Sequence, residues 1–169
     1  MAYEFSPDQD VAGPSVSDGD GGRVIEFAIG FDTESDLIVL MAVMLTRTDR
    51  IDTLELHFGI RTRIGDGPAS APDYSKEAAD SYIPKEGRTS ILDLIRQCVM
   101  RVVADISPSH IVMETYYGHL PPKALAKYAP IGAAVIVCGY KVADQWRDPQ
   151  SGINYWVFSR TAGTQDTKA

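Results

Sequence analysis

The chain has 169 residues, and its content of 44% hydrophobic and 23% charged residues is that of a soluble globular protein with an ordinary core. No apolar run reaches the roughly 18 residues of a membrane-spanning helix, so we expect no membrane association. The net charge of −7 disfavours nucleic-acid binding, but five acidic and no basic residues lie in residues 1–22. The rest of the chain is therefore nearly neutral, and a local basic groove is not excluded.

Composition also divides the chain. Residues 1–22 are rich in Gly, Asp, Ser and Pro and offer little apolar surface, which predicts a disordered acidic tail. We expect a single globular domain over residues 23–160 and a polar C-terminal tail over residues 161–169. The N-terminus lacks the basic flank and apolar core of a signal peptide. Cys98 and Cys138 lie in apolar patterns without metal-binding spacing, which is typical of buried free thiols and indicates a cytoplasmic protein.

The first half of this domain has the pattern of three strands. In residues 23–32 the apolar side chains fall at every second position and the opposite face carries small residues, which predicts a central strand buried on both faces. Residues 37–46 form a β-branched and apolar run, predicted as a strand, with a helix over residues 36–48 as the competing interpretation. Residues 51–63 alternate as a half-exposed strand does. Short polar turns join the three, which predicts an antiparallel meander.

The second half alternates helices and strands. Residues 65–87 are a long polar stretch, and residues 90–106 form the clearest helix, ended by Ser107-Pro108. The buried stripe of this helix is Ile91, Leu94, Ile95, Cys98, Val99, Val102 and Val103. A short buried strand over residues 111–114, a second helix from Pro121 to Gly139 with a kink at Pro130, and strands over residues 141–145 and 153–159 follow. The fold class is therefore α/β (α+β), a mixed sheet covered by helices.

The predicted order, a three-stranded antiparallel meander followed by helix-strand-helix-strand-strand, resembles the ribonuclease-H-like fold. At residue level the chain looks most similar to the RuvC-type resolvases, which cut Holliday junctions. Ile29–Ser35 (I-G-F-D-T-E-S) resembles the first-strand motif of that family, and Pro108–Glu114 resembles its fourth strand, which ends in a Glu. In the family these two strands are neighbours in the sheet.

The resemblance implies a metal site where the two strands end. Asp32 and Glu114 would clamp Mg²⁺ or Mn²⁺ for two-metal phosphodiester cleavage, and Glu34 would add a carboxylate. His119, in the loop after Glu114, is the candidate general acid or base. The family's further acids lie on a C-terminal helix that has no counterpart in this sequence. Asp32-x-Glu34 also resembles the first motif of the DEDD exonucleases, whose other acidic motifs are not visible.

Basic and aromatic side chains near the predicted strand ends are candidates for substrate binding. For phosphates they are Arg61, Arg63, Lys123 and Lys127, and for unpaired bases Tyr116 and Tyr117. Each also has a structural interpretation, a solvated face for the basic residues and packing for the tyrosines. The segment D-T-E-S-D is good turn chemistry, so a turn without function competes with the metal site at Asp32.

Two functions from different classes remain. The first is a metal-dependent nucleic-acid phosphodiesterase of ribonuclease-H-like type, or a degenerate non-catalytic relative of one. The alternative is a small non-enzymatic protein-binding or adaptor protein that uses its acidic tail and the loop over residues 65–87 to contact a protein partner. Two acids at two strand ends favour the first, and the missing third acid favours the second. The sequence leaves the oligomeric state open.

Overall fold

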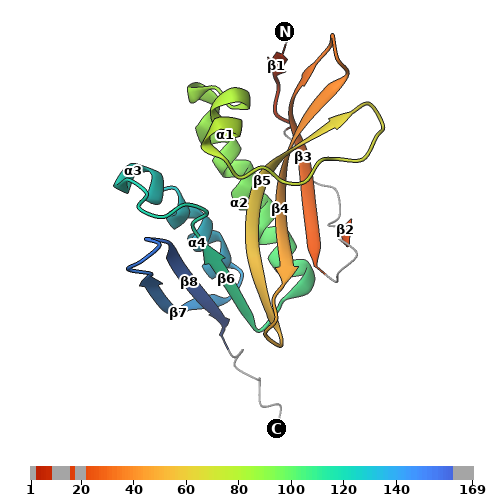
Figure 1. Cartoon of the computed structure of the whole chain (residues 1–169). Coiled ribbons are helices and arrows are strands. Elements are labelled where there is room, and N and C mark those ends of the chain that lie inside the picture. Colours follow the sequence, from red (N-terminus) through yellow and green to blue (C-terminus); the bar gives the residue numbers. More distant parts are fainter. Residues whose placement is uncertain (1–2, 9–15, 18–21, 162–169) are drawn as a thin grey trace.

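A computed structural model of the protein describes residues 3–8, 16–17 and 22–161. The fold is a mixed α+β arrangement, a sheet with helices packed on one face (Figure 1). The strands are β1 (Tyr3–Phe5), β2 (Val16–Ser17), β3 (Arg23–Asp32), β4 (Leu37–Arg47), β5 (Thr53–Ile64), β6 (His110–Glu114), β7 (Tyr140–Arg147) and β8 (Asn154–Arg160). The helices are α1 (Lys76–Tyr82), the 3-10 turn η1 (Lys85–Gly87), α2 (Arg88–Ile106), α3 (Pro122–Leu125) and α4 (Tyr128–Val137).

The eight described strands form one sheet in the order β1-β3-β4-β5-β6-β8-β7, and β2 also pairs with β3. All pairs are antiparallel except β5 and β6, which are parallel because the chain crosses over through α2 between them. The antiparallel meander β3-β4-β5 that the sequence predicts is confirmed. Residues 37–47 are a strand and not a helix, and the alternation of β5 is as predicted.

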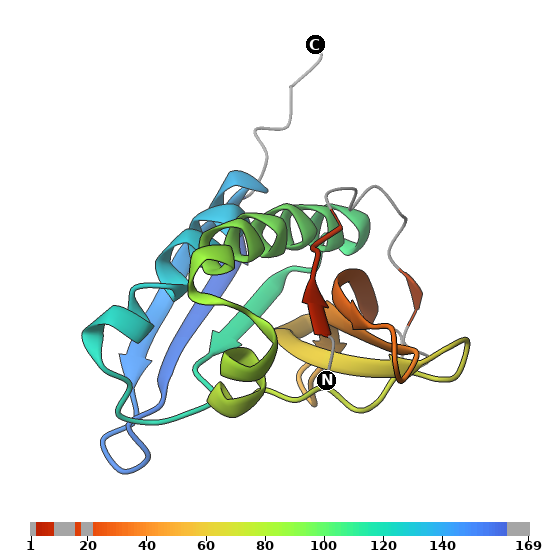
Figure 2. The ribbon, with the colours of Figure 1, turned by 90° about the horizontal axis from the view of Figure 1, so that it is seen from above.

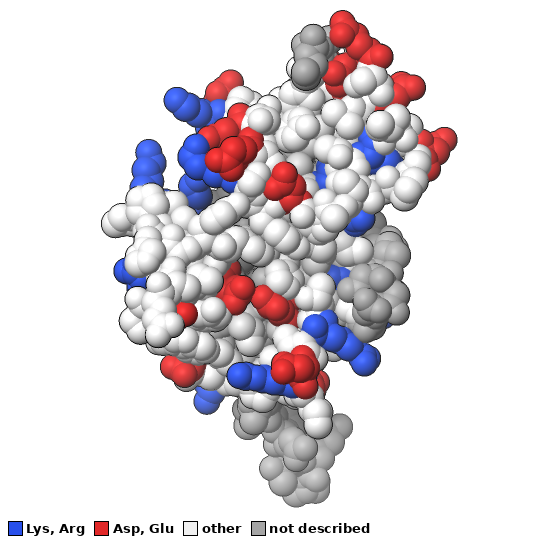
Figure 3. All heavy atoms as spheres, in the orientation of Figure 1, with Lys and Arg blue, Asp and Glu red and all other residues white. Residues whose placement is uncertain are grey.

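The core lies between the sheet and α2 with α4, which run side by side over one face, here called the helix face (Figure 2). Every residue of the predicted stripe on α2, from Ile91 to Val103, is buried. The opposite face, here called the open face, is crossed near its upper end by the segment 65–75 (Figure 1). On the part of the open face visible in Figure 3, the described basic side chains do not merge into a continuous patch.

The second helix is interrupted earlier than predicted. It divides into α3 and α4 at Ala126–Lys127, one turn before Pro130, and Pro130 lies in the first turn of α4. The reason is that a proline ring clashes with the carbonyl group four residues before it and supplies no N–H group to it. Proline is tolerated in a first turn, so the chain restarts the helix there and avoids a kink.

The N-terminal residues that the structure describes are not a free tail. Tyr3–Phe5 pair with Gly30–Asp32 of β3, and the side chains of Tyr3 and Phe5 pack against the core. The Tyr3 hydroxyl donates a hydrogen bond to the carbonyl oxygen of Tyr82, at 3.0 Å. The expectation of disorder over residues 1–22 does not hold for this strand, and most of the remaining tail lies outside the described residues. The C-terminal tail, predicted over residues 161–169, is described only at Thr161.

The sheet order contradicts the ribonuclease-H-like arrangement. That fold would place the fourth strand of the domain beside the first, which means β6 beside β3. Instead β6 pairs with β5, and the outer edge of β3 is taken by β1 and β2. The resemblance to RuvC-type resolvases is therefore wrong at the level of topology, although the order of elements from β3 to β8 is as predicted apart from α1, η1 and the division of the second helix. Among the described helices, none is both long and apolar enough to cross a membrane.

Candidate functional site

The parallel strands β5 and β6 separate partway along the sheet, and this separation creates an apolar hollow. They pair only from Thr53 with His110 to Leu56 with Met113. Beyond that point β6 ends, while β5 continues to Ile64. Segment 70–73 takes over the freed edge of β5, since Ile60 and Asp73 exchange two backbone hydrogen bonds of 2.9 and 2.7 Å. An extended ligand therefore cannot add to this edge as a strand.

On the helix face this separation leaves a cleft of about 490 Å³. Its floor is formed by β4 and β5, one wall by α1 and α2, and the other wall by α3, α4 and the loop after β6. Most of the lining is apolar: Met41, Phe58, Ile60, Ala79, Ile83, Ile91, Leu92, Ile95, Leu120, Ala124 and Ile131. Volume and lining are those of small-molecule sites, which usually occupy roughly 300–1,000 Å³.

Charged side chains stand on the α1–α2 wall of the cleft. Asp80 of α1 accepts a hydrogen bond from the Arg88 guanidinium at 2.6 Å and another from Lys76. These two bonds, from Lys76 first and Arg88 second, hold the pKa of the Asp80 carboxyl below its usual value. Both cations are therefore neutralised in part by Asp80. On the opposite wall Lys127 is exposed.

A group of aromatic and polar side chains closes the side of the cleft where β5 and β6 part. Tyr74, which lines the cleft, stacks on Tyr116 with ring centroids 4.1 Å apart and an angle of 9°. The Tyr116 hydroxyl lies 2.9 Å from Nδ1 of His57, and Nε2 of His57 lies 3.4 Å from a carboxylate oxygen of Glu55. Burial raises the pKa of Tyr116, so its phenol stays protonated and can donate to Nδ1. A neutral His57 then carries its proton on Nε2, towards Glu55.

This chain of three groups is a satisfied polar network and is not itself part of the cleft lining. Tyr116 touches the lining residues Tyr74 and Phe58, and the His57 ring also lies against Tyr74. Glu114 stands beside the network on the open face, and its pKa is raised by burial first and by Glu55 second. The hydrogen-bonded network therefore holds the wall of the cleft in place. This role is consistent with a binding site and gives no direct indication of catalysis on a bound molecule.

The two acids proposed as metal ligands do not meet. Asp32, at the end of β3, pairs with Leu37 of β4, which in turn pairs with Ile64 of β5. Glu114, at the end of β6, comes one residue after Met113, which pairs with Leu56 of β5. The two are thus three strand spacings apart across the sheet, about 14 Å, and seven residues apart along it, about 23 Å. Asp32 is buried and its carboxylate accepts a hydrogen bond from the backbone N–H of Glu34, at 2.9 Å, so it closes the turn.

These distances overturn the nuclease hypothesis. Asp32 and Glu114 cannot hold one Mg²⁺ or Mn²⁺ ion, and Glu34 lies in the exposed turn beside Asp32. In the described residues no group of three or more His, Cys, Asp or Glu side chains has the arrangement of a metal site. The adaptor alternative has no better support. The loop over residues 65–87 is in large part ordered structure, with a segment paired to β5, followed by α1 and η1.

His119 is held in the loop after β6 by contacts with the β7–β8 turn. Its backbone has a φ of 56°, its N–H donates to the Gly152 carbonyl oxygen at 3.1 Å, and its ring lies directly over Gly152. The Arg147 guanidinium lies 2.9 Å from Nδ1 of His119. Because the guanidinium can only donate, Nδ1 of His119 is the acceptor in this contact. A role as general acid or base stays a prediction, but the geometry is that of a loop anchor.

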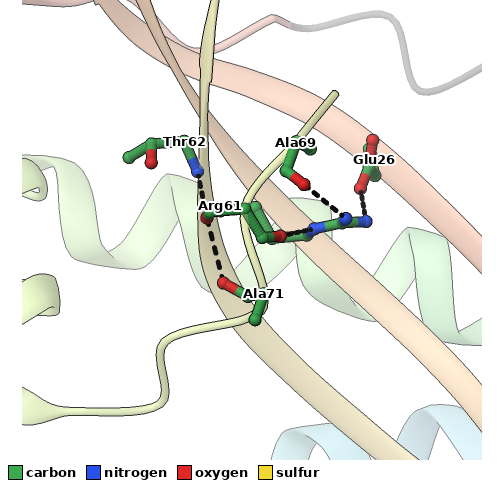
Figure 4. Close-up of polar contacts among 6 residues, drawn as sticks. Glu26, Arg61, Thr62, Ala69 and Ala71 are labelled. Atoms are coloured by element: carbon green, nitrogen blue, oxygen red, sulfur yellow. Dashed lines mark hydrogen bonds and ion pairs between the residues drawn. The ribbon is translucent and has the colours of Figure 1, made fainter. Parts of the chain in front are cut away.

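Arg61 lies on the open face and reaches across β4 (Figure 4). Its guanidinium is paired with Glu26 of β3 and donates to the carbonyl oxygens of Ser70, at 2.6 Å, and Ala69, at 3.3 Å. These contacts bind the segment 65–75 to the sheet, which leaves this guanidinium little capacity for a phosphate. Arg63 is half-buried, and its Nε has no hydrogen-bond partner among the described residues.

The other substrate-binding candidates fall into two groups. Tyr117 and Lys127 line the cleft, and Tyr116 supports it. Lys123 is exposed on α3 outside it. The sequence analysis did not identify Tyr74, His57 and Glu55 as members of the aromatic and polar group beside the cleft. The alternation of β5 placed His57 and Glu55 on one face, but no local pattern could show that Tyr74 of the long loop folds back over them.

No known protein family matches the chain, and no curated protein matches it. Two solved structures are similar. One is a chimera of the spermidine N-acetyltransferase SpeG from Vibrio cholerae and hSSAT, with 14% identity and a TM-score of 0.40, covering 85% of this chain and 68% of the other. The second is a mutant of SpeG from Vibrio cholerae, with 14% identity and a TM-score of 0.38, covering 83% of this chain and 64% of the other. At this level of similarity neither structure assigns a function to this chain.

Proposed function

We propose that the protein binds a small, mainly apolar molecule in the cleft between the α1–α2 wall and the α3–α4 wall. The observation that carries the proposal is the cleft itself, about 490 Å³ with apolar side chains from both walls and the floor. Packed interiors leave few voids larger than a water molecule, and exposed apolar surface of this kind usually marks a binding site. A ligand would bury that surface.

The charges at the mouth narrow the class of ligand. Asp80 pairs with both Lys76 and Arg88, so one carboxylate faces two cations and the α1–α2 side keeps one net positive charge. On the other side Lys127 is the nearest cation. An apolar body with a neutral or single anionic group fits this distribution better than a cationic molecule does, because the cations that line the cleft, Lys76, Arg88 and Lys127, outnumber its carboxylates, Asp73 and Asp80.

A matched set of probes tests both points. Decanol, decanoate and decylamine share one apolar chain and differ in the charge of one end. Binding is followed by the fluorescence of Trp156, which stacks on the cleft residue Tyr128 with centroids 5.6 Å apart, in a Trp146→Phe background. We expect saturable binding in the order decanoate, decanol, decylamine.

The control variants decide whether the signal comes from the cleft. Ala124→Phe places a ring inside the cleft, and Ala104→Phe places the same ring at an exposed position of α2 outside it. We expect Ala124→Phe to weaken binding at least tenfold and Ala104→Phe to leave it unchanged, with both melting within a few degrees of wild type. Equal binding to the two variants would refute the proposal, as would saturable binding of none of the probes.

A further inference from the structure

The outer face of α4 is apolar and exposed, which is unusual for a helix on the surface. From Tyr128 to Gly139 the sequence contains no charged residue and no polar side chain other than the Tyr128 hydroxyl and the Cys138 thiol. The inner face, which includes Ile131 and Val135, packs on the sheet and α2. On the outer face Val137 is 75% exposed and Ile136 is 46% exposed. A helix that is apolar all round is normally covered all round.

The neighbouring helix shows how this protein treats a solvated face. α2 packs beside α4 on the same face of the sheet, and its exposed positions carry Asp93, Gln97 and Asp105. Figure 2 shows α4 at the outer margin of this helical layer, and no other helix or strand among the described residues lies beyond it. The two helices differ in their outward-facing side chains, which include charged and polar residues on α2 and are apolar on α4. The composition of α4 is therefore that of a helix that packs against a partner on both faces.

We infer that the outer face of α4 binds a second copy of this chain, with the two α4 helices antiparallel about a two-fold axis at Ala133. The exposed residues Ala129, Ala133, Ile136 and Val137 of α4 recur at intervals of three and four, the spacing by which helices pair. The two alanines among them let two helix backbones approach closely.

The face is complementary to itself in size and charge. An axis at Ala133 places Ala129 of one copy opposite Val137 of the other, and Pro130 opposite Ile136, so each large side chain meets a smaller one. Lys127, at the start of one α4, then lies beside Gly139 at the end of the other. A cation next to the carbonyl end of a helix is stabilising, whereas Lys127 at the start of its own helix is not. Along the helix, this pairing brings no two acidic and no two basic side chains together.

Val142 of β7 widens the same surface. It pairs with the buried Phe158 and therefore points to the helix face, where it is 46% exposed. One helix face and one strand residue on each side bury less than the ~800 Å² per partner of a standard stable interface. The dimer is therefore a weak one, and we expect it to form at high micromolar concentration.

Sedimentation equilibrium from about 10 µM to 1 mM tests the interface. The wild type should dimerise within this range, and Val137→Glu should weaken the dimer at least tenfold because it buries a carboxylate in the pair. Ala104→Glu adds the same charge to the outer face of α2 and should behave as wild type. A wild type that stays monomeric up to 1 mM overturns the inference, and so does a dimer that Val137→Glu leaves intact. Because Val137 is exposed in one chain, its replacement should not affect folding.

Cross-linking tests the register in a Cys138→Ser background. Ala133→Cys should form a disulfide-linked homodimer, because the two copies of this position meet on the axis. A mixture of Ala129→Cys and Val137→Cys chains should form the mixed dimer in excess over either homodimer. Homodimers of Val137→Cys in excess would indicate parallel helices and overturn the antiparallel pairing. None of these experiments depends on a ligand in the cleft, so the two proposals stand or fall separately.

Discussion

The packing of the N-terminal strand β1 can be tested through one glycine. Gly87 precedes α2, is buried, and has helical backbone angles (φ −82°, ψ −12°) that any residue can adopt. A Cβ atom at this position would overlap the ring of Phe5. Gly87→Ala should therefore destabilise the protein by about 1–2 kcal/mol, the lower part of the range for overpacking, because the ring sits on a short strand that can shift in part.

The test is a double-mutant cycle measured by urea unfolding at 25 °C. Phe5→Ala alone should cost about 1.5–2.5 kcal/mol, roughly half the value for a fully buried ring, since Phe5 is half-buried. In the Phe5→Ala background the overlap is gone, and Gly87→Ala should then stabilise by about 0.4–1 kcal/mol by restricting the unfolded chain. The sign of the Gly87 effect thus reverses, with a coupling energy of about 1.5–3 kcal/mol.

Gly132→Ala serves as the control, because its Cβ would meet Phe158 at 3.3 Å and not Phe5. Its effect should be the same in both backgrounds. If Gly87→Ala has the same cost with and without the Phe5 ring, β1 does not pack against η1 as described, and the reasoning fails.

Three further outcomes are expected. Arg61→Ala should cost about 1–1.5 kcal/mol in thermal or urea unfolding, because it removes a partly exposed ion pair with Glu26 and two hydrogen bonds to the segment 65–75. The exposed Lys123→Ala should change stability by about 0.5 kcal/mol or less, and equal effects of the two substitutions would contradict the bracing role of Arg61. Glu114→Gln should stabilise the protein at pH 7. The pKa of Glu114 is raised on folding, so the contribution of this carboxyl to stability is complete below its unfolded pKa of 4.5 and is lost as pH rises. Unfolding curves measured across pH should therefore show that the stabilisation by Gln disappears below pH 4.5. The pKa of Tyr3 is raised to about 12, by burial first and by Tyr82 second, so the wild type should lose stability as pH rises from 10 towards 12, and Tyr3→Phe should lose less over the same interval in pH-dependent unfolding.

Local pattern alone was enough to predict most elements and their buried faces. The alternation of β3 and β5 and the helical stripe of α2 follow from the periods of the two structures, 2.0 and 3.6 residues, and each is a property of a short stretch of sequence. The final hairpin, β7 with β8, was predicted in the same way from two apolar runs and a turn. These features need no knowledge of what packs against them.

The candidate site was predicted only in fragments. Tyr117 and Lys127 were named as binding residues, but for a nucleic acid, and they line an apolar cleft. The cleft depends on where β6 stops beside β5 and on the path of the segment 70–73, which are contacts between residues far apart in the sequence. The turn at Asp32 was one of two interpretations, and its hydrogen bond to the Glu34 N–H is what the turn requires.

The sequence by itself determined the order of the main strands and helices from β3 onward, the antiparallel meander and the buried stripe of α2. Only the tertiary structure decided which strands are neighbours. The meander offers two edges, and the same order of elements allows β6 to join either of them. Tyr3–Phe5 and Val16–Ser17 occupy the edge of β3, so the crossover through α2 leaves β6 the edge of β5. The physical reason is that a strand edge binds whichever segment reaches it through backbone hydrogen bonds, which carry little information about sequence.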